Sequence, residues 1–325
     1  MTSEAPTPQR SFSGPGLILG GLLLMIIAVI AWRIPHLLRA IEEKKNLGPE
    51  AFMTNGFDMP EDLRSDGDFV RWGAPGQIIA VDLPETWEQN KVEELSKNFR
   101  KRFLVSSSEV VGVTIEGQSR AYPLRLLQWH EVVNDVVGGV PICVVYHPLS
   151  ETLAVFRRIP QAPNTEPPLF GNSGLVIDCC LLINDRLGQG MRDQESLWSP
   201  VDGIALSGPR NGEALQFLPF TLTTWKGWLE EAPDTDVMAM LESHRNYYKK
   251  EPYLPYRQRD LPKYPYSPTA PAGPKNLDRV LITGMGSERK GVLIEKMIGE
   301  EMPQESFVIS AWFATHAREI PVESP

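Results

Sequence analysis

The stretch from Arg120 to Phe156 constrains the fold most strongly, because apolar runs alternate along it with polar and turn-forming residues: RAYPLRLLQWHEVVNDVVGGVPICVVYHPLSETLAVF. A helix is predicted from Pro123 into the HEVVND segment, and Gly138-Gly139 is expected to end it. The VPICVVYH segment that follows is rich in β-branched residues and predicts a strand. This order indicates a domain that combines short helices with strands.

The rest of the chain extends the same pattern. Strands are predicted at 78–83, 109–115 and 119–122, and in the segments LAVFRR, GLVIDCCLLIND and GIALSG, while FGNSG at 170–174 is interpreted as a hairpin turn. Helices are predicted at 223–230 and 236–249. The strand-rich middle of the chain favours an α+β fold, mostly antiparallel β-sheet with short helices, preceded by one N-terminal transmembrane helix.

Composition excludes some classes of protein. The 325 residues carry a formal net charge of -9, and no basic stripe is present to neutralise phosphates, so a nucleic-acid partner is not expected. The three cysteines are an odd number, and Cys179 and Cys180 are adjacent, which does not fit a small disulfide-stabilised fold. We find no Walker loop, nucleophile elbow, dinucleotide fingerprint or HExxH motif, so the familiar enzyme classes lose support.

The residues from Ser11 to Trp32 include no charged side chain. As a helix they would span roughly 33 Å, enough to cross a bilayer. We interpret them as a retained single-span anchor, with a cleaved signal peptide as the alternative. The basic residues that follow the span outnumber the lone Arg10 and place the large domain in the cytoplasm by the positive-inside rule.

Two features of the chain suit partner contacts. Gly16 and Gly20 form a GxxxG spacing that lets another transmembrane helix approach closely, although glycines are also common in such helices. The segment 247–274 holds six of the eight tyrosines and seven prolines, so we expect an extended arm that either wraps its own domain or clasps a partner. The candidate partner contacts are Gly16, Gly20, Tyr253, Tyr256, Tyr264 and Tyr266.

These observations divide the chain as follows: a tail at 1–10, an anchor and juxtamembrane helix at 11–48, an irregular connecting segment at 49–104, and a domain at 105–325 that includes the arm. Residues 109–127 align without gaps with 279–297. Both segments are interpreted as strand, turn, strand and helix, so either the domain has two pseudo-repeated halves or two hairpins are alike by chance.

Four motifs in order suggest a family: the 120–156 stretch, FGNSGLVIDCCLLINDR, ESLWSPVDGIALSG and TLTTWKGWLEEAPDTDVM. Together they resemble the bacterial and archaeal domain of unknown function 3179. The resemblance implies no activity. The family pattern has a Cys-Pro-Leu-Cys type of element at this place. This chain has His147-Pro148-Leu149-Ser150 instead, and a histidine and a serine cannot do dithiol chemistry. The family's thiol pattern is similar to that of exported proteins, which favours an extracytoplasmic, periplasmic domain against the local charge count.

The candidate metal ligands are His130, Glu131, Cys143 and His147, since imidazole and thiolate suit Zn or Cu. Cys143 and His147 would lie about 13 Å apart along a strand, too far to chelate one ion, so His130 is the expected partner of His147. We expect a structural histidine and no cofactor, and Zn or Cu bound by these residues is the alternative. Glu131, Asn134 and Asp135 are expected on one face of the predicted helix. Asp185, Arg186, Glu195 and Trp198 are interpreted as a polar pocket or as a buried ion network.

The leading hypothesis is a membrane-anchored, non-catalytic binding or structural module, an accessory subunit that stabilises a membrane protein complex. The lipid bilayer and another transmembrane helix are its expected partners. The rival hypothesis is a metal-binding or redox protein that uses His130 and His147.

Overall fold

The computed structural model describes residues 22–25, 27, 29, 31, 34, 51–65, 69–97, 103–178, 180–187, 191–259, 277–284, 288–294, 301–302, 306–310, 314 and 322–323. The chain divides into two units, Met1–Phe52 and Met53–Pro325. Within the described ranges, no helix is long and apolar enough to cross a membrane. Most of the predicted span, with Gly16 and Gly20, lies outside these ranges, so the anchor stays a prediction.

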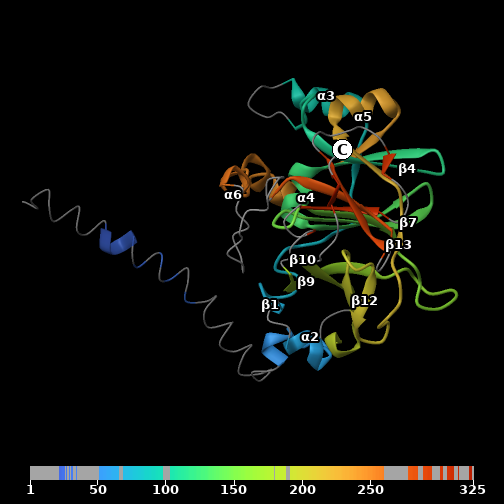
Figure 1. Cartoon of the computed structure of the whole chain (residues 1–325). Coiled ribbons are helices and arrows are strands. Elements are labelled where there is room, and N and C mark those ends of the chain that lie inside the picture. Colours follow the sequence, from blue (N-terminus) through green and yellow to red (C-terminus); the bar gives the residue numbers. More distant parts are fainter. Residues whose placement is uncertain are drawn as a thin grey trace, which may run out of the picture. The chain divides into compact units, whose positions relative to one another are not determined.

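The second unit contains a few short helices and many strands (Figure 1). The helices are α2 (Glu61–Ser65), α3 (Gln89–Ser96), α4 (Leu124–His130), α5 (Trp225–Glu231) and α6 (Leu254–Arg259), and the 3-10 turns are η1 (Arg192–Gln194), η2 (Glu242–His244) and η3 (Tyr247–Lys249). All but three of the recorded strand pairs are antiparallel. This architecture confirms the predicted α+β class with a mostly antiparallel sheet.

The described strands form three sheets. The first sheet, in spatial order, is β1 (Phe69–Arg71), β9 (Leu169–Ile177), β10 (Cys180–Arg186), β11 (Leu197–Ser199) and β12 (Ile204–Ser207). The second is β2 (Val81–Asp82), β6 (Val132–Val137), β7 (Val140–His147), β8 (Thr152–Arg157), β19 (Ser306–Ser310), β16 (Arg279–Thr283), β17 (Lys290–Ile294) and β20 (Val322–Glu323), with β13 (Gln216–Phe217) on β8. The third is β18 (Glu301–Met302), β14 (Phe220–Thr224), β4 (Glu109–Ile115), β5 (Gln118–Pro123), β15 (Asp236–Met238) and β3 (Thr86–Trp87).

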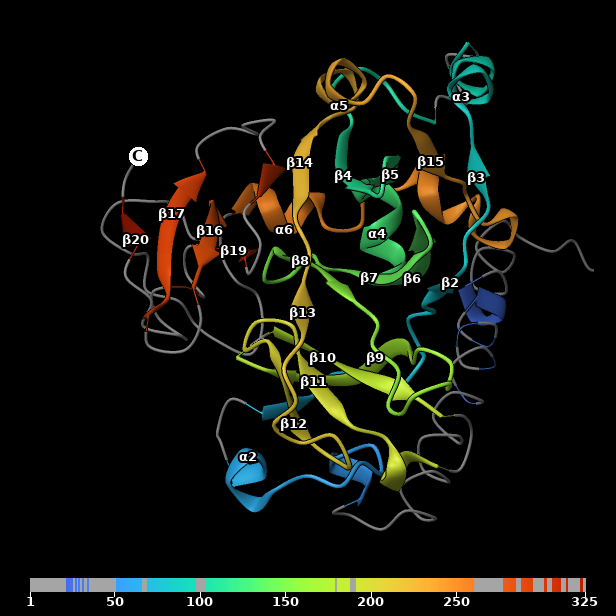
Figure 2. The same ribbon diagram turned by 90° about the vertical axis from the view of Figure 1, so that its right-hand side faces the viewer.

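The second sheet is the middle layer of three. Figure 2 shows β6, β7 and β8 between β4, β5 and β14 above and β9 to β12 below. Along β7, Val144 and Tyr146 pack in the core shared with the upper sheet, whereas Cys143 and Val145 pack in the core shared with the lower sheet. Because neighbouring residues of a strand face opposite sides, burial on both faces explains why VPICVVYH is apolar almost throughout.

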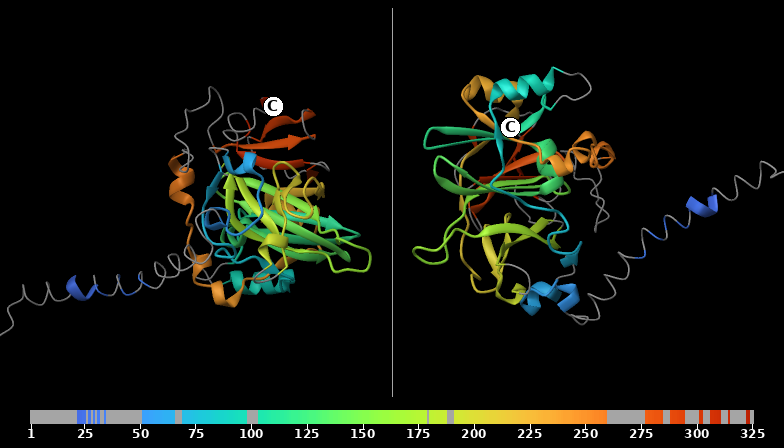
Figure 3. Two further views of the ribbon diagram at one scale, coloured as in Figure 1. Left: turned by 90° about the horizontal axis from the view of Figure 1, so that it is seen from below. Right: turned by 180° about the vertical axis from the view of Figure 1, so that it is seen from behind.

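Helices and a third small core cover the outer faces. Trp225 and Trp228 of α5, together with Val92 of α3, pack on the upper sheet, and Figure 3 shows these two helices at the opposite end of the unit from α2. Leu175 and Leu182 of the lower sheet belong to the core beneath it. The middle sheet is therefore the element on which both major cores depend.

The predicted helix over HEVVND is wrong beyond its first turns. Helix α4 ends at His130, and residues 132–137 form strand β6, which pairs with β7 through the Gly138-Gly139 turn. Valines at four of these six positions favour the strand, and both of its faces are buried. Glu131, Asn134 and Asp135 therefore do not share a helical face. Asn134 and Asp135 point to opposite sides of the sheet.

Three other predictions are corrected. The 236–249 segment is not one helix: β15 fills the place between β5 and β3, and η2 and η3 follow. The FGNSG segment lies inside β9, where Gly174 has a φ of 73° and the pairing register with β10 shifts, so this glycine permits a bulge. The strand predicted at 78–83 is limited to Val81–Asp82. The two halves of the proposed repeat form the β4–β5 and β16–β17 hairpins, in different sheets.

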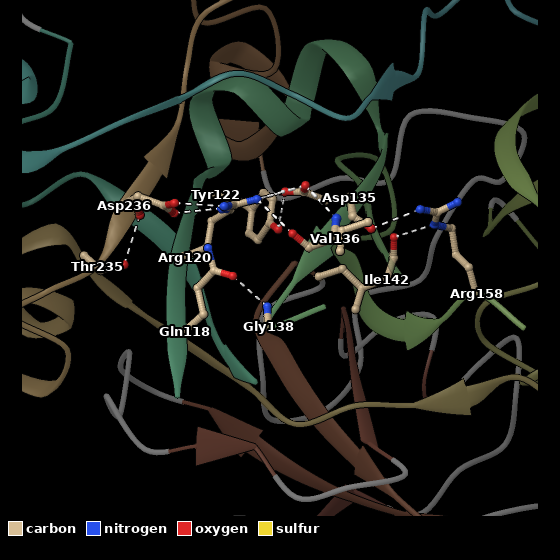
Figure 4. Close-up of polar contacts among 10 residues, drawn as sticks. All are labelled: Gln118, Arg120, Tyr122, Asp135, Val136, Gly138, Ile142, Arg158, Thr235 and Asp236. Atoms are coloured by element: carbon tan, nitrogen blue, oxygen red, sulfur yellow. Dashed lines mark hydrogen bonds and ion pairs between the residues drawn. The ribbon is translucent and has the colours of Figure 1, made fainter. Parts of the chain in front are cut away.

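A buried ion network joins the upper and middle sheets (Figure 4). Arg120 of β5 donates from Nη1 to both carboxylate oxygens of Asp135 on β6, at 2.9 Å each. Its Nε and Nη2 donate to Asp236 of β15, at 2.7 and 2.8 Å. The Tyr122 hydroxyl donates to Asp135 at 2.7 Å, and burial, together with the nearby Asp135 charge, raises the pKa of Tyr122 well above its ordinary value. These bonds link β5 and β15 of the upper sheet to β6 of the middle sheet and so hold the two layers together.

We expect the Arg120→Met variant to lose about 3–5 kcal/mol of unfolding free energy, because it leaves Asp135 as an uncompensated buried charge. Urea unfolding of the purified full chain measures this loss. The control is Lys226→Ala, which breaks an exposed pair with Glu230 and is expected to cost no more than about 1 kcal/mol. Equal losses in the two variants would contradict the role assigned to the network.

Candidate functional site

A second group of buried polar side chains surrounds the turn between β7 and β8 and the residue that follows α4. Glu131 is that residue, and it adopts a φ of 59°, which is unusual for a residue with a side chain. Its amide donates to the Leu127 carbonyl at 2.7 Å, and its own carbonyl accepts from the Tyr146 amide at 2.8 Å. These two bonds fix the junction between helix α4 and the middle sheet.

His147, at the end of β7, lies beside Glu131. Its Nδ1 is 3.3 Å from Glu131 Oε1, and both side chains are 2% exposed. Neither ring nitrogen of His147 has a hydrogen-bond partner among the described residues. Asn172 of β9 donates to the other carboxylate oxygen, Oε2, at 2.5 Å. The centre formed by Glu131, His147 and Asn172 therefore lies between the middle and lower sheets.

The other two candidate ligands lie elsewhere. The Nδ1 atom of His130 is 2.8 Å from the Ile79 carbonyl, and its Nε2 is 2.5 Å from the Tyr248 hydroxyl. Burial is the main reason that the pKa of His130 falls to about 4. Cys143 is fully buried in the core between the middle and lower sheets, and this burial raises the pKa of its thiol far above the ordinary value. The structure therefore brings Glu131 and His147 together and gives His130 its own protein partners.

No group of three or more His, Cys, Asp or Glu side chains that could hold a metal ion occurs in the described part of the chain. Glu131 and His147 are thus a pair, and any metal ion between them would need further ligands from solvent or from a bound molecule. Imidazole nitrogen and carboxylate oxygen both suit zinc. The ligand atoms of this pair therefore suit zinc, whereas Cys143 does not belong to the pair.

The described beginning of the arm packs on its own domain. The Tyr256 hydroxyl donates to the Leu149 carbonyl at 2.7 Å, and Arg257 Nη2 donates to the Tyr146 hydroxyl at 2.8 Å. Tyr253 packs partly buried against the core between the middle and lower sheets, and burial and the Glu131 charge raise its pKa. Tyr264 and Tyr266 lie outside the described residues, so their partner contacts stay predictions.

A charged cleft lies on the other side of the β7–β8 turn. Glu151 accepts from Arg257 Nε at 3.1 Å and from Arg279 Nε at 3.0 Å, and Arg279 Nη1 donates to Glu109 Oε1 at 2.8 Å. Burial opposes ionisation of Glu109, but the neighbouring Arg279 guanidinium holds the pKa of that carboxyl below its ordinary value. These four side chains line a cavity of about 690 Å³, and a second cavity of about 560 Å³ shares Glu109 and Arg257.

The predicted polar pocket is a set of buried contacts in the lower sheet. Asp185 accepts from the Ser196 amide at 2.5 Å, and Glu195 accepts from Asn184 and from the Leu187 amide, each at 2.8 Å. The Trp198 ring packs under the Arg210 guanidinium, 4.8 Å from it. Arg186 instead bonds to Asp82, which also accepts from Asn134. Three of the four residues therefore share one region, and Arg186 joins the lower sheet to the middle one.

Several residues of these sites were not among the sequence candidates. Asn172 was placed in a turn because two glycines flank it, although an amide inside a buried strand must find partners. Glu151, Arg257 and Arg279 are far apart in the chain and only the fold brings them together. One signal could have pointed to Glu151 as a site residue. It is a charged residue that directly follows the HPLS element, in a stretch that is otherwise buried.

The fold and these sites define an α+β protein of three stacked sheets with a buried Glu–His centre and a charged cleft. The chain belongs to the family described as Protein of unknown function (DUF3179), whose model matches residues 78–318. This match confirms the resemblance carried by the four motifs. Neither the curated proteins nor the solved structures that were compared with the chain give a match.

Asp185 provides a test of the lower sheet. Burial raises its pKa from 3.8 to about 6, more than the Ser196 amide bond lowers it. The folded state therefore binds the proton more tightly than the unfolded state, so Asp185 costs stability as the pH rises from about 4 to about 6. In Asp185→Asn this cost is absent, and the variant should gain up to about 3 kcal/mol relative to the parent between pH 4 and pH 7.

Urea unfolding at a series of pH values measures that difference. Asp193→Asn, on the surface turn η1, is the matched control and should follow the parent at each pH. A constant difference between Asp185→Asn and the parent over the whole range would contradict the assigned titration.

Proposed function

We propose that this protein is a non-catalytic binding module, an accessory subunit that stabilises a membrane protein complex. The proposal rests chiefly on the charged cleft. Its arginines and glutamates are bonded to one another and to Tyr146, so the cleft presents a fixed pattern of positive and negative groups. Side chains that are already held by such bonds suit recognition of a polar segment of a partner, because they lose little conformational freedom on binding.

The position of the cleft supports the same use. Its lining includes Arg257 and Gln258 of α6 and Leu277 and Asp278 before β16. These residues precede and follow the stretch 260–276, which lies outside the described residues. A partner segment in this cleft would therefore contact the domain and the arm together. The apolar run at 11–32 would keep the module beside a membrane-embedded partner, with the large domain on the extracytoplasmic side.

Metal binding is the second candidate function, and the unpartnered ring nitrogens of His147 favour it. The redox form of this candidate has less support. Cys143 is fully buried and its pKa is strongly raised, whereas a reactive cysteine is partly exposed with a lowered pKa. Of the two histidines predicted as metal ligands, His147 is therefore the better candidate.

The anchor gives the first test of the proposal. We expect the full chain to stay in the membrane fraction through an alkaline carbonate wash, because a span of about 20 apolar residues inserts firmly. A variant that lacks residues 11–32 should be released to the supernatant, and a variant that lacks residues 2–10 should behave as the parent. Release of the parent chain by the wash would contradict the anchor.

The cleft gives the second test. Gln258→Trp places a bulky ring at an exposed position of the cleft lining and leaves the bonded charges in place. After extraction in mild detergent and purification, we expect this variant to recover about tenfold less of the co-purifying membrane protein than the parent, equivalent to about 1.4 kcal/mol of binding free energy. Lys97→Trp, at an exposed position after α3, is the control. Equal recovery with all three chains, or a parent chain that purifies alone, would contradict the proposal.

A further inference from the structure

The Glu131–His147 centre contains an imidazole whose hydrogen-bonding capacity is unused. A neutral imidazole has one donor and one acceptor nitrogen. The side chain of His147 is 2% exposed, and neither nitrogen has a hydrogen-bond partner among the residues that the structure describes. Most buried polar side chains are paired, so this exception leaves both ring nitrogens available to a ligand that the protein atoms do not supply.

The distance between the two side chains fits a shared metal ion. His147 Nδ1 and Glu131 Oε1 are 3.3 Å apart, yet they do not form a hydrogen bond. Zinc binds imidazole nitrogen and carboxylate oxygen at about 2.1 Å, and two such ligands at a tetrahedral angle are about 3.4 Å apart. The observed separation is therefore close to that expected for two ligands of one tetrahedral ion.

The surroundings hold both groups in place. Asn172 Nδ2 donates to Glu131 Oε2, the carboxylate oxygen that is not paired with His147, and Asn172 Oδ1 accepts from the Gly174 amide at 2.8 Å. The backbone bond from the Tyr146 amide to the Glu131 carbonyl ties the two ligand-bearing segments together. Support of this kind, in which a second residue orients a ligating carboxylate, is typical of metal sites.

We propose that Glu131 and His147 bind one divalent transition-metal ion of the zinc type through Oε1 and Nδ1. Imidazole favours zinc and its neighbours over magnesium and calcium, which prefer oxygen ligands. With two protein ligands, the remaining positions belong to water. The site therefore differs from a closed structural zinc site, which has four protein ligands. This inference deepens the second candidate function, metal binding, and rests on it, whereas it is independent of the partner-binding function proposed above.

The test uses the full chain in mild detergent, purified with a tag free of histidine and stripped of metal by a chelator. Co²⁺ is the probe, because its visible absorption reports an asymmetric, low-coordinate site, and Zn²⁺ is then added to displace it. We expect the parent chain to bind one Co²⁺ per chain. Affinity should fall at least about tenfold in Glu131→Gln and His147→Gln, and by about tenfold or more in Asn172→Ala, which removes the support of the carboxylate.

His244→Gln is the matched control, because His244 is a partly exposed histidine bonded to Ser243 rather than to the centre. It should bind Co²⁺ as the parent does. Circular dichroism and urea unfolding of the metal-free chains establish that each variant is folded. Absence of saturable Co²⁺ binding by the folded parent chain, or equal affinity in Glu131→Gln and the control, would overturn the proposal and leave an internal water as the occupant.

A measurement without variants covers the case in which His147→Gln does not fold. X-ray absorption at the zinc edge of the Zn²⁺-loaded parent chain should show the scattering pattern of an imidazole ring in the ligand shell. A shell of oxygen atoms alone would show that the ion is bound elsewhere, and would equally overturn the assignment.

Discussion

The burial of the middle sheet on both faces is the constraint on which the rest of the structure depends. Strands β6, β7 and β8 have an apolar core on either side, so each polar side chain that they carry must find a partner inside the protein. Asp135 meets Arg120 on the upper side, and Asn134 meets Asp82 and the Phe170 carbonyl on the lower side. The two sites, at Glu131 and at Glu151, are the places where the same requirement is met at the ends of these strands.

The turn between β7 and β8 connects the two sites. Tyr146 and His147 are neighbours on one strand and so face opposite layers: the first contributes its hydroxyl to the charged cleft and the second belongs to the Glu–His centre. Helix α6 contacts both sides of this turn, through Tyr256 at the Leu149 carbonyl and through Arg257 at Glu151. Helix α6 is thus bonded to the turn that lies between the two sites, which do not share a residue.

The sequence allowed the fold class, the family and many strands to be predicted, because local patterns carry that information. The β4–β5 hairpin and strand β7 follow directly from β-branched runs and the Glu116-Gly117 turn. The HEVVND segment was misassigned because its polar residues have helical spacing, and only the pairing with β7 decides against a helix. The Glu131–His147 pairing could be predicted only in part. Both residues were candidate ligands, but His130 was chosen as the partner of His147. The position of β9 and Asn172 cannot be deduced from local patterns. Glu151, Arg257 and Arg279 meet across more than 100 positions of sequence.

Two glutamates, Glu131 and Glu151, have positive φ angles of 59° and 52°, and both are almost completely buried. A glycine at either position would relax the backbone and remove a carboxylate from the interior. Both positions therefore cost stability in the isolated domain. Bonds from Asn172 to Glu131, and from Tyr146 and two arginines to Glu151, offset that cost. If selection acted on thermal stability alone, these two glutamates would be expected to be replaced first. Whether a related chain retains them therefore indicates whether this end of the middle sheet has a role in that chain.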